Sequence, residues 1–229
     1  MTLRLSEIYT SVQGEGPNTG ELVQFVRFGG CNLRCPGWPC DTAFAVDPKF
    51  HKDWDKVEPD VLPNLVADFP RRLCITGGEP LLQPASDLAT AMHLLQKLGY
   101  AIDLFTNGTF PLPSWATCAA TTVVMDWKLP GSGENLSDAQ RDTRWANCRK
   151  LDWGDAIKFV VKDEADLRSA LAVSKALADK SIKAPQWVGA CWGSITDEQI
   201  LAFITQNEVP WKLNVQIHKY LWEPAERGV

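Results

Sequence analysis

Short, nearly continuous apolar runs recur along the chain with helical patterns between them, and this alternation constrains the fold most strongly. Runs of this kind are typical of strands in a parallel sheet that is covered on both faces. Strands that alternate with helices form βαβ units with right-handed crossovers. The runs span Leu22–Phe28, Leu73–Thr76, Ala101–Phe105, Thr122–Asp126, Ile157–Val161, Trp187–Cys191 and Leu213–Ile217.

Helical patterns fill several of the intervals between these runs. Ser86 is placed to cap a helix that Gly99 ends. A second helix is expected from about 164 to 178. A third begins where Thr196 and Gln199 match a capping box, in which each residue satisfies a backbone N–H of the other.

The number of strands sets the architecture. A complete β/α barrel needs eight units and typically about 250 residues. This chain has 229 residues and seven strand candidates. We therefore predict an α/β fold, an incomplete (open) parallel β/α barrel that forms a single domain over residues 1–229. Its ligands are expected at the C-terminal ends of the strands, where the loops gather.

The charge balance argues against two classes of partner. A net charge of −5 and a pI near 5.3 give no basic footprint for nucleic acid or for an anionic membrane surface. The N-terminal residues lack the apolar core of a signal peptide, and no stretch approaches the roughly 20 apolar residues that cross a bilayer. We therefore expect a cytoplasmic protein that binds neither nucleic acid nor membranes.

Seven cysteines, an odd number, argue against a complete disulfide framework. Three of them, Cys31, Cys35 and Cys40, lie in the loop 29–42 that follows the first apolar run. Three thiolates on a loop can hold three corners of a [4Fe–4S] cubane and leave the fourth iron open for a cofactor or substrate. Structural zinc is an alternative, but it favours four ligands in paired C-x2-C knuckles, and neither spacing here is x2. Three unliganded cysteines are the remaining alternative.

The next apolar run leads directly into Thr76-Gly77-Gly78-Glu79-Pro80. Two glycines let the backbone approach a ligand without obstruction by a Cβ, and exposed N–H and C=O groups can bind a zwitterion. Taken alone, this segment is a loop with good turn residues. It becomes specific because it follows a cysteine triad at the end of the preceding strand.

Together the cysteine triad and the Gly-Gly-Glu-Pro loop resemble the radical S-adenosylmethionine (SAM) superfamily. The resemblance implies that the cysteines hold the cluster, that the amino and carboxylate groups of SAM chelate the open iron, and that the glycine loop contacts the SAM amino group. Reductive cleavage of SAM then gives a 5′-deoxyadenosyl radical, which abstracts hydrogen from the substrate. The cofactor performs this step while the protein orients it.

A third segment narrows the resemblance. Residues 11–17 read Ser-Val-Gln-Gly-Glu-Gly-Pro, and Arg27 lies near the end of the first apolar run. The guanidinium of an arginine can form two parallel hydrogen bonds to a carboxylate, and Gln13 and Glu15 can form hydrogen bonds with the donors and acceptors of a heterocycle. With Asp41-Thr42, 106–109 and 216–219 added, the chain is similar to the 7-carboxy-7-deazaguanine synthase family from its N-terminus almost to its end.

That resemblance implies a lyase acting on carbon–nitrogen bonds. The family converts 6-carboxy-5,6,7,8-tetrahydropterin to 7-carboxy-7-deazaguanine with loss of ammonia, by hydrogen abstraction and ring contraction, on the route to 7-deazapurines such as queuosine. It uses SAM catalytically and also uses Mg²⁺. The resemblance further implies a flavodoxin- or ferredoxin-like electron donor and a homodimer.

The same positional match implies roles for individual residues, with no catalytic residue assigned beyond the cluster. Thr42 is expected to bind Mg²⁺, a cation that prefers oxygen ligands and keeps several waters. The residues expected to contact SAM are Trp38, Gly78, Glu79 and Lys128. The residues expected to contact the substrate are Val12, Gln13, Gly14, Glu15, Arg27, Thr76 and His218.

Three features depart from the family pattern. The superfamily commonly has C-x3-C-x2-C, whereas this chain has C-x3-C-x4-C with Pro36 and Pro39 in the longer gap. The stretch 187–191 replaces a segment that usually carries Gln-Pro, and a C-terminal extension covers about 220–229. The alternatives are a radical SAM activase that forms a glycyl radical on a partner protein, and a zinc-binding module without catalysis.

Overall fold

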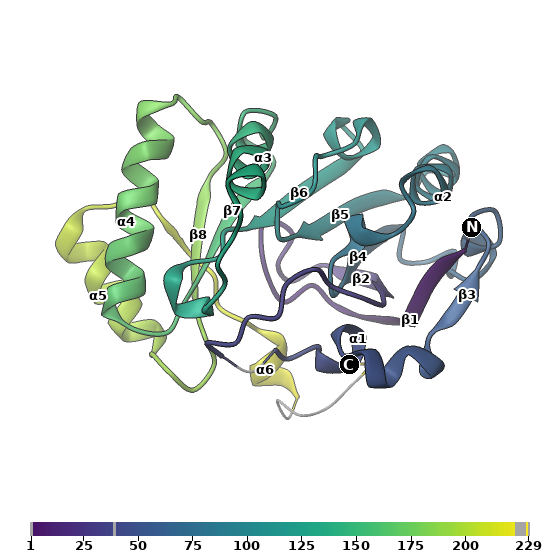
Figure 1. Cartoon of the computed structure of the whole chain (residues 1–229), viewed down its shortest axis with the longest axis horizontal. Helices are drawn as coiled ribbons and strands as arrows, with labels where there is room; N and C mark the ends of the chain where they lie inside the picture. The colour runs from purple at the N-terminus through teal and green to yellow at the C-terminus, as the bar shows by residue number, and fades with distance from the viewer. Residues whose placement is uncertain (1, 39, 223–227, 229) are drawn as a thin grey trace.

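A computed structural model describes residues 2–38, 40–222 and 228 of the chain (Figure 1). Within them the strands form one nine-stranded sheet in the order β3-β1-β2-β4-β5-β6-β7-β8-β9. The strands are β1 (Leu3–Val12), β2 (Leu22–Phe28), β3 (Asp55–Val57), β4 (Arg72–Gly77), β5 (Ala101–Thr106), β6 (Thr121–Asp126), β7 (Ala156–Val161), β8 (Gln186–Ala190) and β9 (Lys212–Leu213). The α-helices are α1 (Ala43–Val46), α2 (Ala85–Lys97), α3 (Asp138–Cys148), α4 (Glu164–Asp179), α5 (Asp197–Asn207) and α6 (His218–Leu221).

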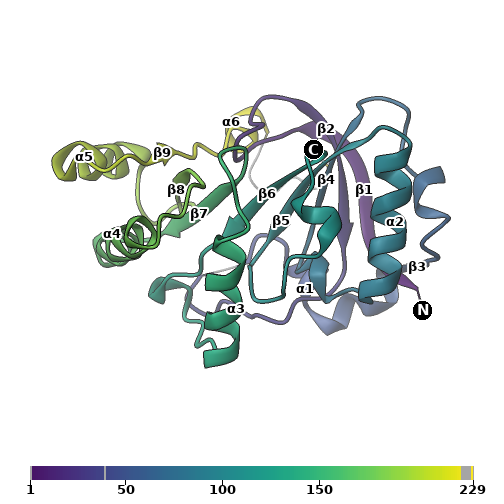
Figure 2. The same ribbon diagram turned by 90° about the horizontal axis from the view of Figure 1, so that it is seen from above.

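The sheet is an open half-barrel. Every neighbouring pair from β2 to β9 is parallel, whereas β1 pairs antiparallel with both β2 and β3. Strands β3 and β9 end the order and do not pair with each other. Helices α2, α3 and α4 lie along the outer face of the curved sheet (Figure 1, Figure 2). The prediction of an open parallel α/β sheet is confirmed.

Six of the seven predicted strands agree with the structure to within one residue at each end. The seventh, expected over Leu213–Ile217, is wrong in length because β9 ends at Leu213. Beyond it the Asn214 N–H still bonds the Val188 carbonyl at 2.7 Å, and the chain then turns toward α6. The prediction also missed β1, which lies ahead of the run taken as the first strand.

The helix predictions have mixed outcomes. The expected helix from about 164 to 178 is confirmed as α4, and the capping box of Thr196 and Gln199 at the start of α5 is confirmed in both directions. Ser86 as a cap is wrong, since α2 begins at Ala85 and Pro84 occupies the cap position. Helix α3 was not predicted, although its start carries a second capping box of Ser137 and Gln140.

Two features singled out in the sequence fall at the limits of the described residues. The C-terminal extension over about 220–229 lies mostly outside them, and only its first residues belong to α6. Pro39, the second proline of the longer cysteine spacing, also lies outside them. The loop 29–42 that carries the three cysteines is therefore described on both sides of that position.

The two faces of the parallel strands differ in chemistry. Side chains alternate between faces along a strand, and the outer set packs under the helices in an apolar core with fully buried members such as Ile75, Ile102 and Phe159. The inner set includes the buried polar residues Asp103 and Lys158. The half-barrel therefore presents polar groups on its inner face. No helix among the described residues is long and apolar enough to cross a membrane.

Candidate active site

The cluster loop, residues 29–42, follows the C-terminal end of β2 and crosses the ends of the parallel strands (Figure 1). Its cysteines Cys31, Cys35 and Cys40 are free and half-buried. Burial raises the pKa of the Cys31 thiol and raises that of Cys35 to about 11, although the nearby Lys128 opposes both shifts. These two thiols therefore keep their protons at neutral pH until a metal displaces them.

The glycine loop after β4 packs directly against the cluster loop. The Glu79 N–H donates to the Gly30 carbonyl at 2.8 Å. A Cβ on Gly78 would lie 2.3 Å from the Gly30 oxygen and 2.8 Å from the Cys31 Cβ, so no larger residue fits there. Gly77 has φ +148°, and a Cβ on it would lie 2.1 Å from the Phe28 oxygen. The two motifs read from the sequence are thus adjacent in space.

Glu79 is fully buried, and its carboxylate accepts hydrogen bonds from protein donors. They are the Thr106 hydroxyl at 2.8 Å, the Asn107 N–H at 2.7 Å and the Leu81 N–H at 3.0 Å. Burial raises the pKa of Glu79 to about 7, against the opposing effect of these bonds. The Glu79 side chain therefore fixes the shape of the glycine loop.

A chain of amides ties the cluster loop to the loop after β5. The Asn107 amide donates to the Asn32 Oδ1 at 3.0 Å, and the Asn32 amide donates to the Thr109 hydroxyl at 2.9 Å. Each of these side chains lies on a loop that follows a parallel strand. The loops after β2, β4 and β5 consequently form one hydrogen-bonded surface.

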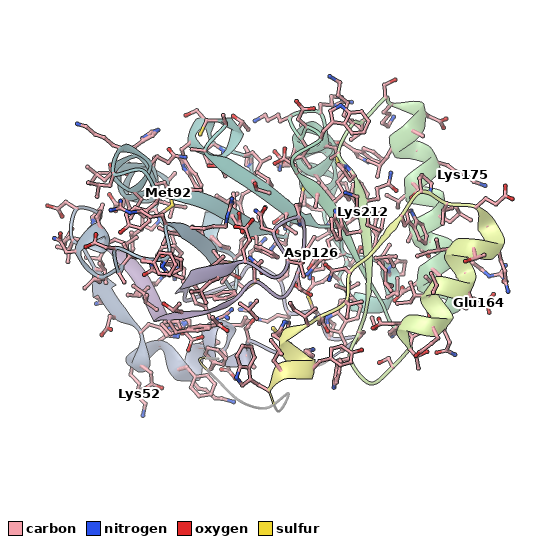
Figure 3. All side chains as sticks on the ribbon, turned by 180° about the vertical axis from the view of Figure 1, so that it is seen from behind. Lys52, Met92, Asp126, Glu164, Lys175 and Lys212 are labelled. Atoms are coloured by element: carbon pink, nitrogen blue, oxygen red, sulfur yellow. The ribbon has the colours of Figure 1, made fainter. Side chains whose placement is uncertain are left out.

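Lys128 reaches the cluster loop from the C-terminal end of β6. Its ammonium lies 2.7 Å from Asp126 and 5.9 Å from the centre of the Trp38 ring. Burial alone would lower the pKa of Lys128, but Asp126 and the thiols of Cys35 and Cys31 raise it. Asp126 lies near the centre of the molecule (Figure 3). The lysine is thus a fixed, largely buried cation beside the cysteines and not a solvated surface residue.

A deep ion pair occupies the middle of the half-barrel. The Glu15 carboxylate accepts from Lys158 Nζ at 2.8 Å, Gln216 Nε2 at 2.8 Å and Asn214 Nδ2 at 3.3 Å. Burial alone would raise the pKa of Glu15, but Lys158 and the hydrogen bonds outweigh it and hold the pKa at about 2. Glu15 is therefore a permanent anion at neutral pH.

The same segment is anchored at its other end on β5. The Gln13 amide donates to Asp103 at 3.3 Å, the Asn18 amide donates to Asp103 at 2.8 Å, and Arg72 pairs with Asp103 at 2.9 Å. The segment therefore crosses the interior from β5 to the end of β9. We call residues 13–18 with their partners Asp103, Lys158, Asn214 and Gln216 the site floor.

The C-terminal region closes over the site floor. The Ile217 N–H donates to the Gly14 carbonyl at 3.3 Å. A Cβ on Gly14 would lie 2.0 Å from the His218 Nδ1, so the imidazole rests on the glycine backbone. Burial lowers the pKa of His218, although Glu15 opposes the shift. Gly14 and His218, which the sequence placed in one site, therefore lie in contact.

Arg27 and Thr76 are direct neighbours on β2 and β4. The Arg27 Nε donates to Glu7 at 2.7 Å and its Nη2 to the Tyr9 hydroxyl at 3.0 Å. Val12 pairs with Leu22 at the opposite end of β2 from Arg27. The structure therefore brings Arg27 and Thr76 together but leaves Val12 at the other end of the strand.

Thr42 lies directly beside the third cysteine of the cluster loop. Its Oγ1 is 3.5 Å from the Cys40 Sγ, and its side chain makes no capping bond to α1. The Thr42 hydroxyl, which contacts the Cys40 sulfur, is an oxygen of the kind that a hard cation prefers.

The sequence interpretation missed several residues of the site. Lys158 belongs to an otherwise apolar strand, and Asp103 and Asp126 belong to strands whose other residues are apolar or threonine. A charged residue in such a strand is a signal that was available. Asn214 had no such signal because its role depends on contact with Glu15 and Gly16 from the far end of the chain.

A cavity of about 400 Å³ opens beside the site floor. It lies between the β8–α5 connection and α6, and residues that line it include Ala190, Trp192, Asn214, Gln216 and Tyr220. Among the described residues the buried Gln216 Oε1 has no hydrogen-bond partner. The site floor therefore contains an acceptor without a donor as well as an anion.

The cluster loop offers three thiols, and the thiolates of a cubane bind three different irons. Among the described residues no three His, Cys, Asp or Glu side chains converge so that they could hold one metal ion. Half-exposed thiols on one loop beside a buried ammonium fit an anionic cluster.

No family model matches the chain. Curated relatives match over almost its whole length, and all three described here are 7-carboxy-7-deazaguanine synthases. The protein of Clostridium acetobutylicum is 33% identical over 233 residues, which cover 100% of both chains. That of Methanospirillum hungatei is 33% identical and covers 97% of this chain and 86% of its own. That of Neisseria meningitidis is 31% identical and covers 95% and 92%.

Solved structures share the fold. QueE from Escherichia coli superposes with a TM-score of 0.70 at 24% identity and covers 94% of each chain. The histidine-tagged protein anSMEcpe with bound AdoMet superposes with a TM-score of 0.52 at 16% identity, covering 81% of this chain and 60% of that one. These two proteins therefore share the open half-barrel fold of this chain.

Proposed function

The chain belongs to the 7-carboxy-7-deazaguanine synthase family, and on this premise we propose how its own residues divide the work of the reaction. It is a radical SAM lyase that converts 6-carboxy-5,6,7,8-tetrahydropterin to 7-carboxy-7-deazaguanine with loss of ammonia. Its cofactors are a [4Fe–4S] cluster, SAM and Mg²⁺. When bound, the cluster and SAM supply the 5′-deoxyadenosyl radical that abstracts hydrogen from the substrate.

Cys31, Cys35 and Cys40 are the cluster ligands in this proposal. The support is their place on one loop at the strand ends, with thiols half-buried and free. The buried Lys128 ammonium lies near two of them and stabilises added negative charge. A structural zinc site is disfavoured by the absence of converging ligands among the described residues.

The glycine loop and Lys128 form the proposed SAM site. Gly78 brings backbone to within contact of Cys31, so backbone groups can meet the amino group of SAM. Glu79 holds that backbone in place through its bonds to the loop after β5. Lys128 and Trp38 lie together on the other side of the cysteines and offer a cation and an aromatic face.

The site floor is the proposed substrate platform. Glu15 stays ionised and orients the Gln216 amide, whose unused Oε1 can accept an N–H of the heterocycle. Gly14 and His218 complete this side, and Val12 and Gln13 are the further proposed substrate contacts, with Gln13 held by Asp103. Arg27 beside Thr76 provides a guanidinium for the substrate carboxylate. Thr42 would supply an oxygen ligand to Mg²⁺, a cation that prefers oxygen.

We also infer the setting in which the enzyme works. The chain is proposed to fold as one domain, to act as a homodimer, and to receive electrons from a flavodoxin- or ferredoxin-like donor. Clustered free thiols suit a reducing compartment, which favours the cytoplasm. The product is expected to enter the synthesis of 7-deazapurines such as queuosine.

One observation carries the proposal, namely the direct packing of Gly78 on Gly30 and Cys31. It joins the cysteine triad to the glycine loop in a chain whose described relatives share one activity. The test is anaerobic reconstitution with iron and sulfide, followed by incubation with SAM, 6-carboxytetrahydropterin and dithionite. We expect 7-carboxy-7-deazaguanine from the native protein and none from Cys31→Ala. SAM cleavage without pterin turnover would refute the substrate assignment, and zinc without iron or sulfide would refute the cluster.

A further inference from the structure

Pro36 and Gly37, in the longer spacing between Cys35 and Cys40, pack against the turn that precedes α3. The Gly37 N–H donates to the Ser132 carbonyl at 2.9 Å. A Cβ on Gly37 would lie 2.0 Å from the Gly131 oxygen, and a Cβ on Gly133 would lie 2.9 Å from the Pro36 Cγ. Two segments about a hundred residues apart therefore meet at glycines that leave no room for a Cβ, and residues 36 and 37 of the longer spacing have a defined place in the fold.

Glu134 fastens this contact with its side chain. Its Oε1 accepts the N–H groups of both Arg34 and Cys35. Its own N–H donates to the Ser132 hydroxyl at 3.2 Å, and that fully buried hydroxyl donates to the Leu129 carbonyl at 2.7 Å. The carboxylate is thus held from the turn before α3 and binds consecutive amides of the cluster loop, as anions do in a backbone nest.

The backbone at Cys35 needs such support. Its φ is +44°, in the left-handed region that residues other than glycine rarely adopt. A strained residue of this kind persists only where its surroundings hold it. The Glu134 carboxylate accepts the N–H of this residue, so it opposes relaxation of the strained conformation.

We propose that Glu134 is a positioning residue that sets Cys35 in its ligand-ready conformation and places a negative charge beside the cluster. Because it takes the Cys35 N–H, that donor is withheld from cluster sulfur. Fewer N–H donors to sulfur and more negative charge both lower the reduction potential of an iron–sulfur cluster. Glu134 therefore makes the cluster harder to reduce. The inference rests on the proposed ligand role of Cys35.

The positioning role is tested without any cluster. Hydrogen exchange of the metal-free protein would be compared for native protein, Glu134→Ala and Glu134→Gln, with Asp138→Asn as the matched control. Asp138 is an exposed carboxylate on the adjacent helix. We expect exchange of the Arg34 and Cys35 amides to rise roughly ten- to a hundredfold in Glu134→Ala. Glu134→Gln keeps an acceptor oxygen and should retain most of the protection. Unchanged protection in Glu134→Ala would overturn the proposal.

The electrostatic role is tested by the midpoint potential of the reconstituted cluster, followed by its visible absorbance. Both Glu134 variants lose the charge, so both should move the potential to more positive values, while Asp138→Asn leaves it in place. A potential that is unchanged in both, or that becomes more negative, would overturn this role. Failure of the native protein to assemble a cluster would instead refute the cysteine assignment, and the exchange experiment would still decide the positioning role.

Discussion

Side chains hold the site floor, whereas backbone contacts hold most of the cluster loop. Glu15 meets Lys158 and Gln216 through a carboxylate, an ammonium and an amide, all largely buried. The cluster loop is instead held by main-chain bonds such as Glu79 N–H to the Gly30 carbonyl and by glycines that touch backbone. Among the described residues the side chains of Cys31, Cys35 and Cys40 have few hydrogen-bond partners, which suits the ligand role proposed for them.

This contrast predicts that substitutions in the site floor mainly change stability, whereas substitutions of the cluster-loop cysteines mainly change cofactor binding. Truncating a side chain of the site floor leaves a buried charge or amide unpaired, which costs folding free energy. Truncating a cysteine removes a ligand while the backbone contacts of the cluster loop stay in place. The two regions should therefore respond differently to substitution, and five experiments test that difference.

The largest effect is expected from Cys31→Ala. Cluster content and turnover should be lost completely, since two thiolates do not complete the site. The free energy of unfolding of the metal-free protein should stay within about 1 kcal/mol of the native value. Iron and sulfide analysis with urea denaturation measures both. Cys118→Ala, at an exposed cysteine, is the control and should keep its cluster. A fully loaded Cys31→Ala protein would remove Cys31 from the ligand set.

Glu15→Ala tests the site floor. It leaves the Lys158 ammonium buried without its partner, and the expected loss is about 3–5 kcal/mol in the free energy of unfolding. Urea denaturation provides the measurement. Glu164→Ala is the control because its pair with Arg168 is exposed and should cost less than about 1 kcal/mol. Equal losses in the two variants would contradict the buried ion pair.

Glu15 in the site floor and Glu79 in the glycine loop beside the cluster loop should change the free energy of unfolding with pH in opposite directions. The Glu15 pKa falls from 4.5 to about 2 on folding, so its stabilisation is complete above pH 4.5 and is lost as the pH drops to 2. The Glu79 pKa rises from 4.5 to about 7, so stability declines as the pH rises through that interval. At 1.36 kcal/mol per pKa unit, each effect is about 3 kcal/mol. Denaturation of Glu15→Gln and Glu79→Gln across pH should flatten each limb separately.

Gly14→Ala probes the seam between the site floor and α6. The new methyl group collides with the His218 ring, and overpacking of this kind costs about 1–3 kcal/mol. Thermal denaturation and the KM for the pterin should both report the change. Gly154→Ala is the matched control, because a Cβ there meets open space. Equal melting temperatures for native protein and Gly14→Ala would show that α6 yields without cost.

Thr42→Ala should have the smallest effect. It removes one proposed oxygen ligand of Mg²⁺ and leaves the cluster loop in place. The Mg²⁺ concentration for half-maximal activity should rise by roughly tenfold while the iron content stays the same. Steady-state rates across a Mg²⁺ titration provide the measurement. An unchanged Mg²⁺ requirement would exclude Thr42 from the site.

The two regions also differ in how far the sequence predicts them. The cluster loop is contiguous, so its cysteines and glycines can be read as a motif, and the strand that precedes it was predicted at its observed bounds. The site floor joins Glu15 to partners 143 and 201 residues away, and no spacing encodes that contact. Lys158 inside an apolar strand signals a buried charge but does not identify its partner.

A sequence motif also does not show whether a side chain is already hydrogen-bonded to other protein groups. Glu79 belongs to the segment assigned to SAM, yet Thr106 and Asn107 occupy its carboxylate. Those donors lie at the end of β5, which is the neighbour of β4 in the sheet. A local motif does not contain this strand order. Strand β1 escaped prediction for a related reason: it lies next to the edge strand β3, so its pattern is only weakly apolar.

The contact between Glu15 and Gln216 also has a consequence for synthesis, because the proposed pterin platform needs both ends of the chain. A nascent chain that ends before β9 already contains the cluster loop, the glycine loop and six of the parallel strands, but it lacks Asn214 and Gln216. Closing so long a chain segment carries an entropic cost that is met only when these last contacts form. The proposed pterin platform can therefore form only after Asn214 and Gln216 have been synthesised, and we expect a shorter nascent chain not to bind the substrate.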